Sequence, residues 1–136
     1  MLLILLSTAT VLAQTARVQI IHNAPDPTVD VYVNGVNTFD DFAFRTATGF
    51  LTLPAGIQLS IGVAPASSTS VSAVLFNFDV TFENGKTYVV TASGIVFDQD
   101  TPFTLITDAN GREASAGPSI VDLSVLHGAP DAPAVD

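Results

Sequence analysis

The chain is organised around His22-Asn23-Ala24-Pro25-Asp26-Pro27-Thr28-Val29-Asp30, which continues into Val31-Tyr32-Val33-Asn34-Gly35. A close copy returns as His127-Gly128-Ala129-Pro130-Asp131-Ala132-Pro133-Ala134-Val135-Asp136, with one extra residue between its Asp and its second Pro. We call residues 22–30 the first motif and residues 127–136 the second motif. The only two histidines open these motifs, 105 positions apart. That spacing matches the length of one small β domain and predicts a repeated unit.

Apolar and polar residues alternate with a period of two around both motifs, which is typical of half-buried strands. Val18, Ile20 and His22 share one face of the strand that enters the first motif. The second copy repeats this order with Leu123, Val125 and His127, opposite Asp122 and Ser124. The histidine face is therefore predicted to point into the core.

The rest of the chain reads as short strands separated by turn residues, with Asn34-Gly35 as a strong hairpin turn. No helical period occurs beyond the N-terminal apolar run. The pattern predicts an all-β fold, a single antiparallel β-sandwich of seven to eight strands, immunoglobulin-like or transthyretin-like in strand count. The Cys-Trp-Cys hallmark of true immunoglobulin domains is absent. The strands are expected near residues 16–22, 29–33, 36–44, 50–53, 57–63, 76–82, 88–92 and 103–107, and an extension of the strand at 88–92 as far as Phe97 is left open.

The N-terminal run from Leu2 to Ala13 is apolar and too short to span a bilayer. It ends in Val11-Leu12-Ala13, so residues 1–13 are predicted to be a signal peptide cut after Ala13. No Lys or Arg precedes the run. Either Met1 is an internal start, or the free amino terminus supplies the charge; the alternative is a buried N-terminal strand or helix. We expect a β-sandwich domain at 16–112, a linker at 113–120 and the truncated start of a second repeat at 121–136.

Charge argues against nucleic-acid and membrane partners. The chain has thirteen acidic residues and four scattered basic residues, which gives a formal net charge of −9. Without a basic patch, neither phosphates nor anionic lipid surfaces would be attracted, and no membrane insertion is expected after signal removal. There is no cysteine, which removes disulfides, thiolate nucleophiles and cysteine-type zinc sites. We expect no cofactor.

Several phrases together resemble the bacterial domain-of-unknown-function family 4397, a secreted β domain often found in tandem. They are Ala16-Arg17-Val18-Gln19-Ile20-Ile21-His22 with Ala24-Pro25-Asp26, then Val29 to Gly35, Gly49-Phe50-Leu51-Thr52-Leu53-Pro54-Ala55-Gly56 and Gly85-Lys86-Thr87-Tyr88-Val89-Val90. The resemblance covers about residues 16 to 108 and the restart at 121. The first motif departs by the residue missing between Asp26 and Pro27. The family has no established activity, so the resemblance implies location and fold and lends no catalytic residues.

The candidate site residues are those of the two motifs. His22 with Asp26 and Asp30 is the only arrangement that suggests acid–base chemistry, but no Gly-x-Ser-x-Gly elbow accompanies it. We expect a structural role in which His22 hydrogen-bonds the backbone of the turn and His127 repeats that role. The full structural set is His22, Pro25, Asp26, Pro27, Asp30, His127, Pro130 and Asp131.

Two minor alternatives remain open. Alternation places Asp30 and Tyr32 on the outward face of their strand, where Tyr32 could stack on a sugar. Asp98-x-Asp100 and Asp108-x-Asn110-Gly111 offer oxygen ligands for calcium, but they flank one strand and favour turns on their own. A weak calcium at Asp108 and Asn110 is the minority reading.

Three functions follow, in order of expectation. The first is a secreted or cell-surface, non-catalytic modular domain of a tandem-repeat protein, with a spacer or adhesion role. Its partners would be neighbouring repeats of the same chain, surface glycans or other extracellular proteins. The second is a carbohydrate-binding accessory module, and the third is an uncharacterised hydrolase.

Overall fold

The computed structural model describes residues 13–25, 27–129 and 132–133. The predicted signal peptide, apart from Ala13, and the motif residues Asp26, Pro130 and Asp131 lie outside this part. The described residues form nine strands and one short 3₁₀ helix. They are β1 (Thr15–His22), β2 (Val29–Val33), β3 (Val36–Phe42), β4 (Thr46–Ala47), β5 (Leu51–Pro54), β6 (Gln58–Pro65), η1 (Val71–Ala73), β7 (Phe76–Thr81), β8 (Thr87–Ser93) and β9 (Thr104–Asp108).

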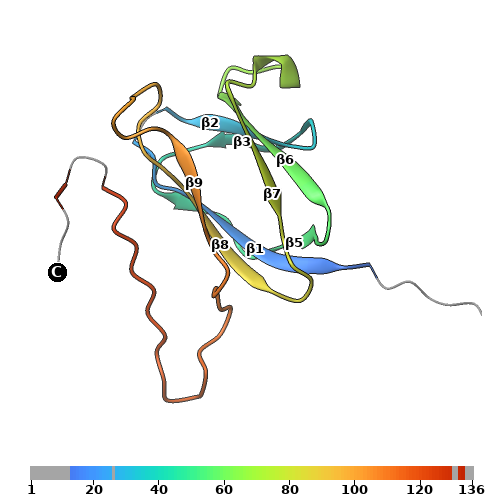
Figure 1. Cartoon of the computed structure of the whole chain (residues 1–136), viewed down its shortest axis with the longest axis vertical. Helices are drawn as coiled ribbons and strands as arrows, with labels where there is room; N and C mark the ends of the chain where they lie inside the picture. Colours follow the sequence, from blue (N-terminus) through green and yellow to red (C-terminus); the bar gives the residue numbers. More distant parts are fainter. Residues whose placement is uncertain (1–12, 26, 130–131, 134–136) are drawn as a thin grey trace, which may run out of the picture.

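The strands form two facing sheets, which confirms the predicted all-β sandwich (Figure 1). One sheet has the order β4-β1-β8-β9, with β5 also paired to β1. The other has the order β3-β2-β6-β7. All pairs are antiparallel except β1 and β8, which run parallel from Arg17 beside Thr87 to His22 beside Ala92. Local alternation cannot show this pairing, because it joins strands far apart in the sequence.

The core lies between the sheets and is built from the inward positions of the alternating strands. Leu59 is fully buried, Val18 is 1% exposed and Phe82 is 2% exposed. Phe76 and Phe78 of β7 also pack against this core, as their alternation predicts. Burying a large aliphatic or aromatic side chain in this way stabilises the fold by roughly 1.5–3 kcal/mol.

A turn at Asn34-Gly35 joins β2 to β3, as expected, with φ values of 49° and 82°. Positive φ at both central residues is the geometry of a tight hairpin turn, for which Asn-Gly is best suited. The observed strands match the expected ones to within a few residues. The two-residue β4 and the helix η1 were not predicted.

The segment after β9 departs from expectation. A strand was expected from residue 121, as in the first copy, but residues 121–129 form none. Val121, Leu123 and Val125 are 82%, 86% and 92% exposed. These positions correspond to the inward face of β1, and here no sheet receives them. Within the described residues, no helix is long and apolar enough to cross a membrane.

Candidate functional site

His22 is the last residue of β1 and points into the sandwich, where its side chain is 2% exposed. Its Nε2 atom lies 3.2 Å from the carbonyl oxygen of Pro27 and therefore carries the proton that it donates. The ring lies 5.7 Å from that of Phe42 and 6.4 Å from that of Phe44, centroid to centroid. The expected hydrogen bond between the histidine and its turn is thus present. This bond leaves the ring fixed at the end of the sheet.

Burial also sets the charge state of His22. Removal of the ring from water lowers its pKa below 6.5, and the Pro27 carbonyl opposes this only in part. The Nδ1 atom is buried and has no hydrogen-bond partner. In this state Nε2 keeps its proton and donates it in a hydrogen bond to a backbone carbonyl, and Nδ1 is buried. The imidazole is therefore not positioned to take a proton from a nucleophile.

Asp30 and Tyr32 are not on an exposed face, so the predicted ligand face is wrong. Asp30 is fully buried, and Tyr32 is only 4% exposed. The connection between β6 and β7 covers the outer face of β2: the Tyr32 hydroxyl lies 2.8 Å from Ser68 Oγ. A Cβ atom on Gly62 would lie 2.8 Å from Val74 of the same connection. Alternation showed which face each residue takes, but a loop that folds over that face is a tertiary feature.

The Asp30 carboxylate holds two separate segments against β2. It accepts a hydrogen bond of 2.5 Å from Ser68 Oγ and one of 3.0 Å from the backbone amide of Asp41. Asp41 lies where the β2–β3 register shifts, and its φ is 52°. Such an irregularity leaves an amide without a partner in the ladder, and Asp30 satisfies it. The bonds from Ser68 and Asp41 lower the pKa of Asp30, so the carboxylate stays ionised and structural.

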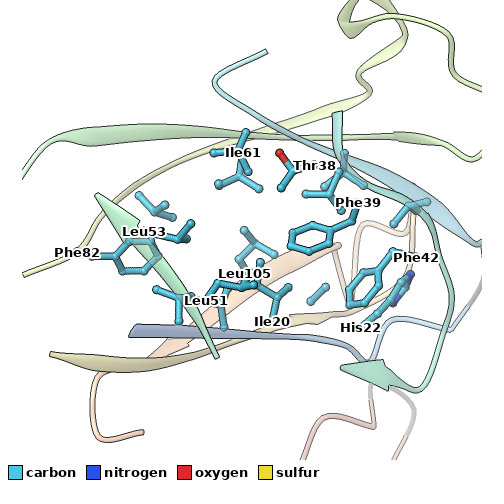
Figure 2. A pocket seen from close by; sticks show the side chains of 18 of the residues that line it. Ile20, His22, Thr38, Phe39, Phe42, Leu51, Leu53, Ile61, Phe82 and Leu105 are labelled. Carbon is cyan, nitrogen blue, oxygen red and sulfur yellow. The ribbon is translucent and has the colours of Figure 1, made fainter. Parts of the chain in front are cut away.

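The two sheets enclose a small cavity of about 50 Å³ (Figure 2). Ile61 and Phe39 lie on one side of it, and Leu51, Leu53 and Leu105 lie on the other. His22 and Phe42 close one end. The walls are almost wholly apolar, so the cavity offers little that would orient a ligand. We interpret it as a packing gap in the core.

The loop between β8 and β9 holds an exposed aromatic residue that the sequence reading missed. Phe97 is 76% exposed, has a φ of 63° and packs against Phe76, with ring centroids 5.5 Å apart and the rings tilted by 37°. Asp98 braces this loop by accepting bonds from the amides of Asp100 and Thr101 and from the Thr101 hydroxyl. The Thr101 bonds lower the pKa of Asp98. The Asp98-x-x-Thr101 spacing was a visible turn signal, but alternation put Phe97 at a strand end.

The residues considered for calcium form turns. Asp108 Oδ1 accepts bonds from the backbone amide and the side-chain amide of Asn110, at 2.9 and 3.0 Å. One carboxylate oxygen of Asp98 accepts hydrogen bonds from backbone amides of its own loop. In the part of the chain that the structure describes, no three His, Cys, Asp or Glu side chains come together in a way that could hold a metal ion.

His127 repeats the contact of His22. Its Nε2 atom lies 3.0 Å from the carbonyl oxygen of Pro133, the second proline of the second motif. Pro27 has the same place in the first motif. The two histidines thus make the same bond, although His127 is exposed and belongs to no sheet. The motif can close its own turn outside the sandwich.

Fold and site together define a small all-β sandwich whose paired histidine motifs bind their own backbone turns. The model of the family named Domain of unknown function (DUF4397) matches residues 16–136. The chain belongs to this family. The match covers the sandwich, the segment after β9 and the second motif. No match to a curated protein was found.

Proposed function

We propose that the chain is a non-catalytic modular β domain of a tandem-repeat protein that acts outside the cell, as a spacer or adhesion unit, without a cofactor. The observation that carries this proposal is the repeated bond of His22 to Pro27 and of His127 to Pro133. A motif that closes the same turn twice in one chain is a building element of a repeat. A catalytic histidine needs a ring nitrogen available to the substrate, whereas in both motifs Nε2 is engaged with a carbonyl of the same motif.

The surroundings of His22 support the absence of catalysis. A general base must reach the proton that it removes, and this ring is 2% exposed with its donor bound to Pro27. The side chain of Ser68 forms hydrogen bonds with the Asp30 carboxylate and the Tyr32 hydroxyl. A hydroxyl that donates to a carboxylate without a histidine is not the arrangement of a hydrolase triad.

The test is a panel of ester, glycoside, phosphate and peptide substrates with the purified chain. We expect no turnover above buffer. A matched variant, His22→Gln, keeps a donor at this place, and circular dichroism shows whether it is folded. Turnover by the wild type that a folded His22→Gln variant lacks would replace this proposal with that of a hydrolase.

An extracellular location is the second part of the proposal. It is supported by the apolar run that ends at Ala13 and by the low share of charged residues, 12%. When the chain is expressed with its own N-terminus, the exported product is expected to begin at Gln14. Mass spectrometry of exported protein decides this, and an intact Met1 on that material contradicts the signal peptide.

Carbohydrate binding is the second candidate function. Because Tyr32 is buried, the aromatic residue that could contact a sugar is Phe97. An exposed ring on a braced loop is an available stacking surface, and Asp100 and Gln99 beside it are exposed polar groups. A glycan array with wild type, Phe97→Ala and the control Val71→Ala, at another exposed apolar side chain, tests it. Binding lost only in Phe97→Ala supports a glycan partner, and no binding by the wild type removes this candidate.

A further inference from the structure

Residues at the same place in the two motifs touch each other. The side-chain amide of Asn23 donates to the carbonyl oxygen of Gly128 at 3.3 Å, and Ser93 Oγ donates to the same oxygen at 3.4 Å. Asn23 follows His22, and Gly128 follows His127. The second motif therefore lies against the first one, at the end of the sheet where β1 and β8 finish.

Glycine at 128 leaves room for the side chain of Asn23. A Cβ atom there would lie 2.6 Å from Asn23 Nδ2 and 3.4 Å from Ser93 Oγ. Distances below 3.0 Å force a neighbour to move. The first motif has an asparagine at this position, so the two copies differ at the residue where they meet. With a side chain at 128, the amide end of Asn23 would have to leave its present position, and its bond to the Gly128 carbonyl would be disturbed.

The segment that leads to this contact is also fixed at the opposite end of the sheet. Arg17, near the start of β1, forms a two-pronged ion pair with Glu113, at 2.6 and 2.8 Å. The Gly111 amide donates to the carbonyl oxygen of Thr87 at 3.1 Å, at the start of β8. The chain then turns and runs back beside the sandwich to the first motif (Figure 1). The second motif thus reaches Asn23 from a defined starting point.

A hollow surrounds the contact. Its walls are Asn23, Pro25, Phe44, Arg45 and Ile95 from the sandwich, and residues 126–129 of the second motif. Arg45 has a φ of 65° and its amide donates to the His22 carbonyl at 2.8 Å, which ties this wall to the first motif. The hollow is therefore built by the same backbone that the first motif shapes.

We propose that the contact of Gly128 with Asn23 and Ser93, at the edge of this hollow, holds the His-Gly-Ala stretch of the following motif in the same chain, so that consecutive units are joined at a fixed angle. The inference rests on the proposed modular function and deepens it: the neighbouring unit is the partner, and Gly128 against Asn23 is the contact that recognises it. In a chain of units joined this way, the contact restricts the orientation of each unit relative to the next. Units joined only by a flexible linker would reorient freely.

The test measures backbone order parameters of the whole chain by NMR relaxation. In the wild type, Gly128 and Ala129 are expected to approach the value of about 0.85 typical of rigid backbone. In Gly128→Ala they are expected to fall below about 0.6, and the side-chain amide signal of Asn23 is expected to shift. Gly117→Ala, in the same segment, meets only the Ile120 side chain at 3.4 Å and is the matched control. It is expected to leave both readouts unchanged.

A second variant, Asn23→Ala, removes the donor without changing the second motif and is expected to loosen Gly128 as well. The proposal is overturned if Gly128 and Ala129 are already mobile in the wild type, or if Gly128→Ala leaves them ordered. It is equally overturned if the Asn23 signal changes with protein concentration, because Asn23 would then be in contact with another molecule. None of these readouts depends on export or turnover, so this inference and the proposed function can fail separately.

Discussion

The Nε2 atom of His22 lies 3.2 Å from the carbonyl oxygen of Pro27, and this bond joins the end of β1 to the turn that leads into β2. The ring itself is buried against Phe42. One side chain thus connects a turn, a strand and the core. The bond of His127 to Pro133 shows the same contact without the core, at 3.0 Å. A comparison of the two histidines therefore distinguishes the contribution of the hydrogen bond from the contribution of packing in the core.

Replacing His22 with alanine is expected to lower the free energy of unfolding by about 1–3 kcal/mol, because the Pro27 carbonyl loses its donor and the rings around it lose their neighbour. His127→Ala removes the same bond from an exposed site and is expected to change stability by less than about 0.5 kcal/mol. Urea unfolding of both variants beside the wild type measures this. Equal effects of the two substitutions would show that burial of His22 adds nothing.

The stability of the chain is expected to fall as the pH drops below neutral. The pKa of His22 in the folded state lies below its unfolded value of 6.5 because the ring is buried. Between these two pKa values the unfolded chain binds more protons, so stability is lost as pH falls through 6.5 towards the folded pKa. Urea midpoints from pH 8 to pH 5 test this. The dependence should persist in His127→Ala and disappear in a folded His22→Gln variant.

Asp30→Asn is expected to destabilise the chain by about 1–3 kcal/mol, because Ser68 and the Asp41 amide lose a charged acceptor. Tyr32→Phe removes only the hydroxyl at the end of this network and is expected to cost less, about 0.5–1.5 kcal/mol. The lowered pKa of Asp30 means that its contribution is present above pH 3.8 and is lost as pH falls through the folded value. Thermal unfolding of the two variants ranks them, and a larger effect of Tyr32→Phe would contradict the network.

Gly94→Ala is expected to disrupt the loop that presents Phe97. Gly94 has a φ of 85°, and a Cβ atom there would collide with the carbonyl oxygen of Pro102. Strain and collision together are expected to cost more than about 2 kcal/mol or to unfold the loop locally. Gly49→Ala has no neighbour within 4 Å and no positive φ, and is expected to be nearly neutral. Amide hydrogen exchange of residues 94–102 locates the change, and unaltered protection in Gly94→Ala would refute it.

The sequence by itself determined the class of fold, every strand of the sandwich except β4, and the histidine turn. These depend on short-range features: alternation with a period of two, the Asn34-Gly35 turn and the prolines after His22. Each acts within a few residues, so each is readable locally. The inward side of β1 was also readable, because the second copy repeats the pattern beside Asp122 and Ser124.

Only the tertiary structure decided what covers each face. The loop holding Ser68 and Val74 buries Asp30 and Tyr32, and no local pattern announces a loop that folds back over its own sheet. The parallel pairing of β1 with β8 and the approach of Gly128 to Asn23 join positions about 70 and 105 residues apart. The same apolar pattern is buried in β1 and exposed at Val121, Leu123 and Val125. Alternation defines a face, but burial needs a sheet beside the strand and a layer to pack against.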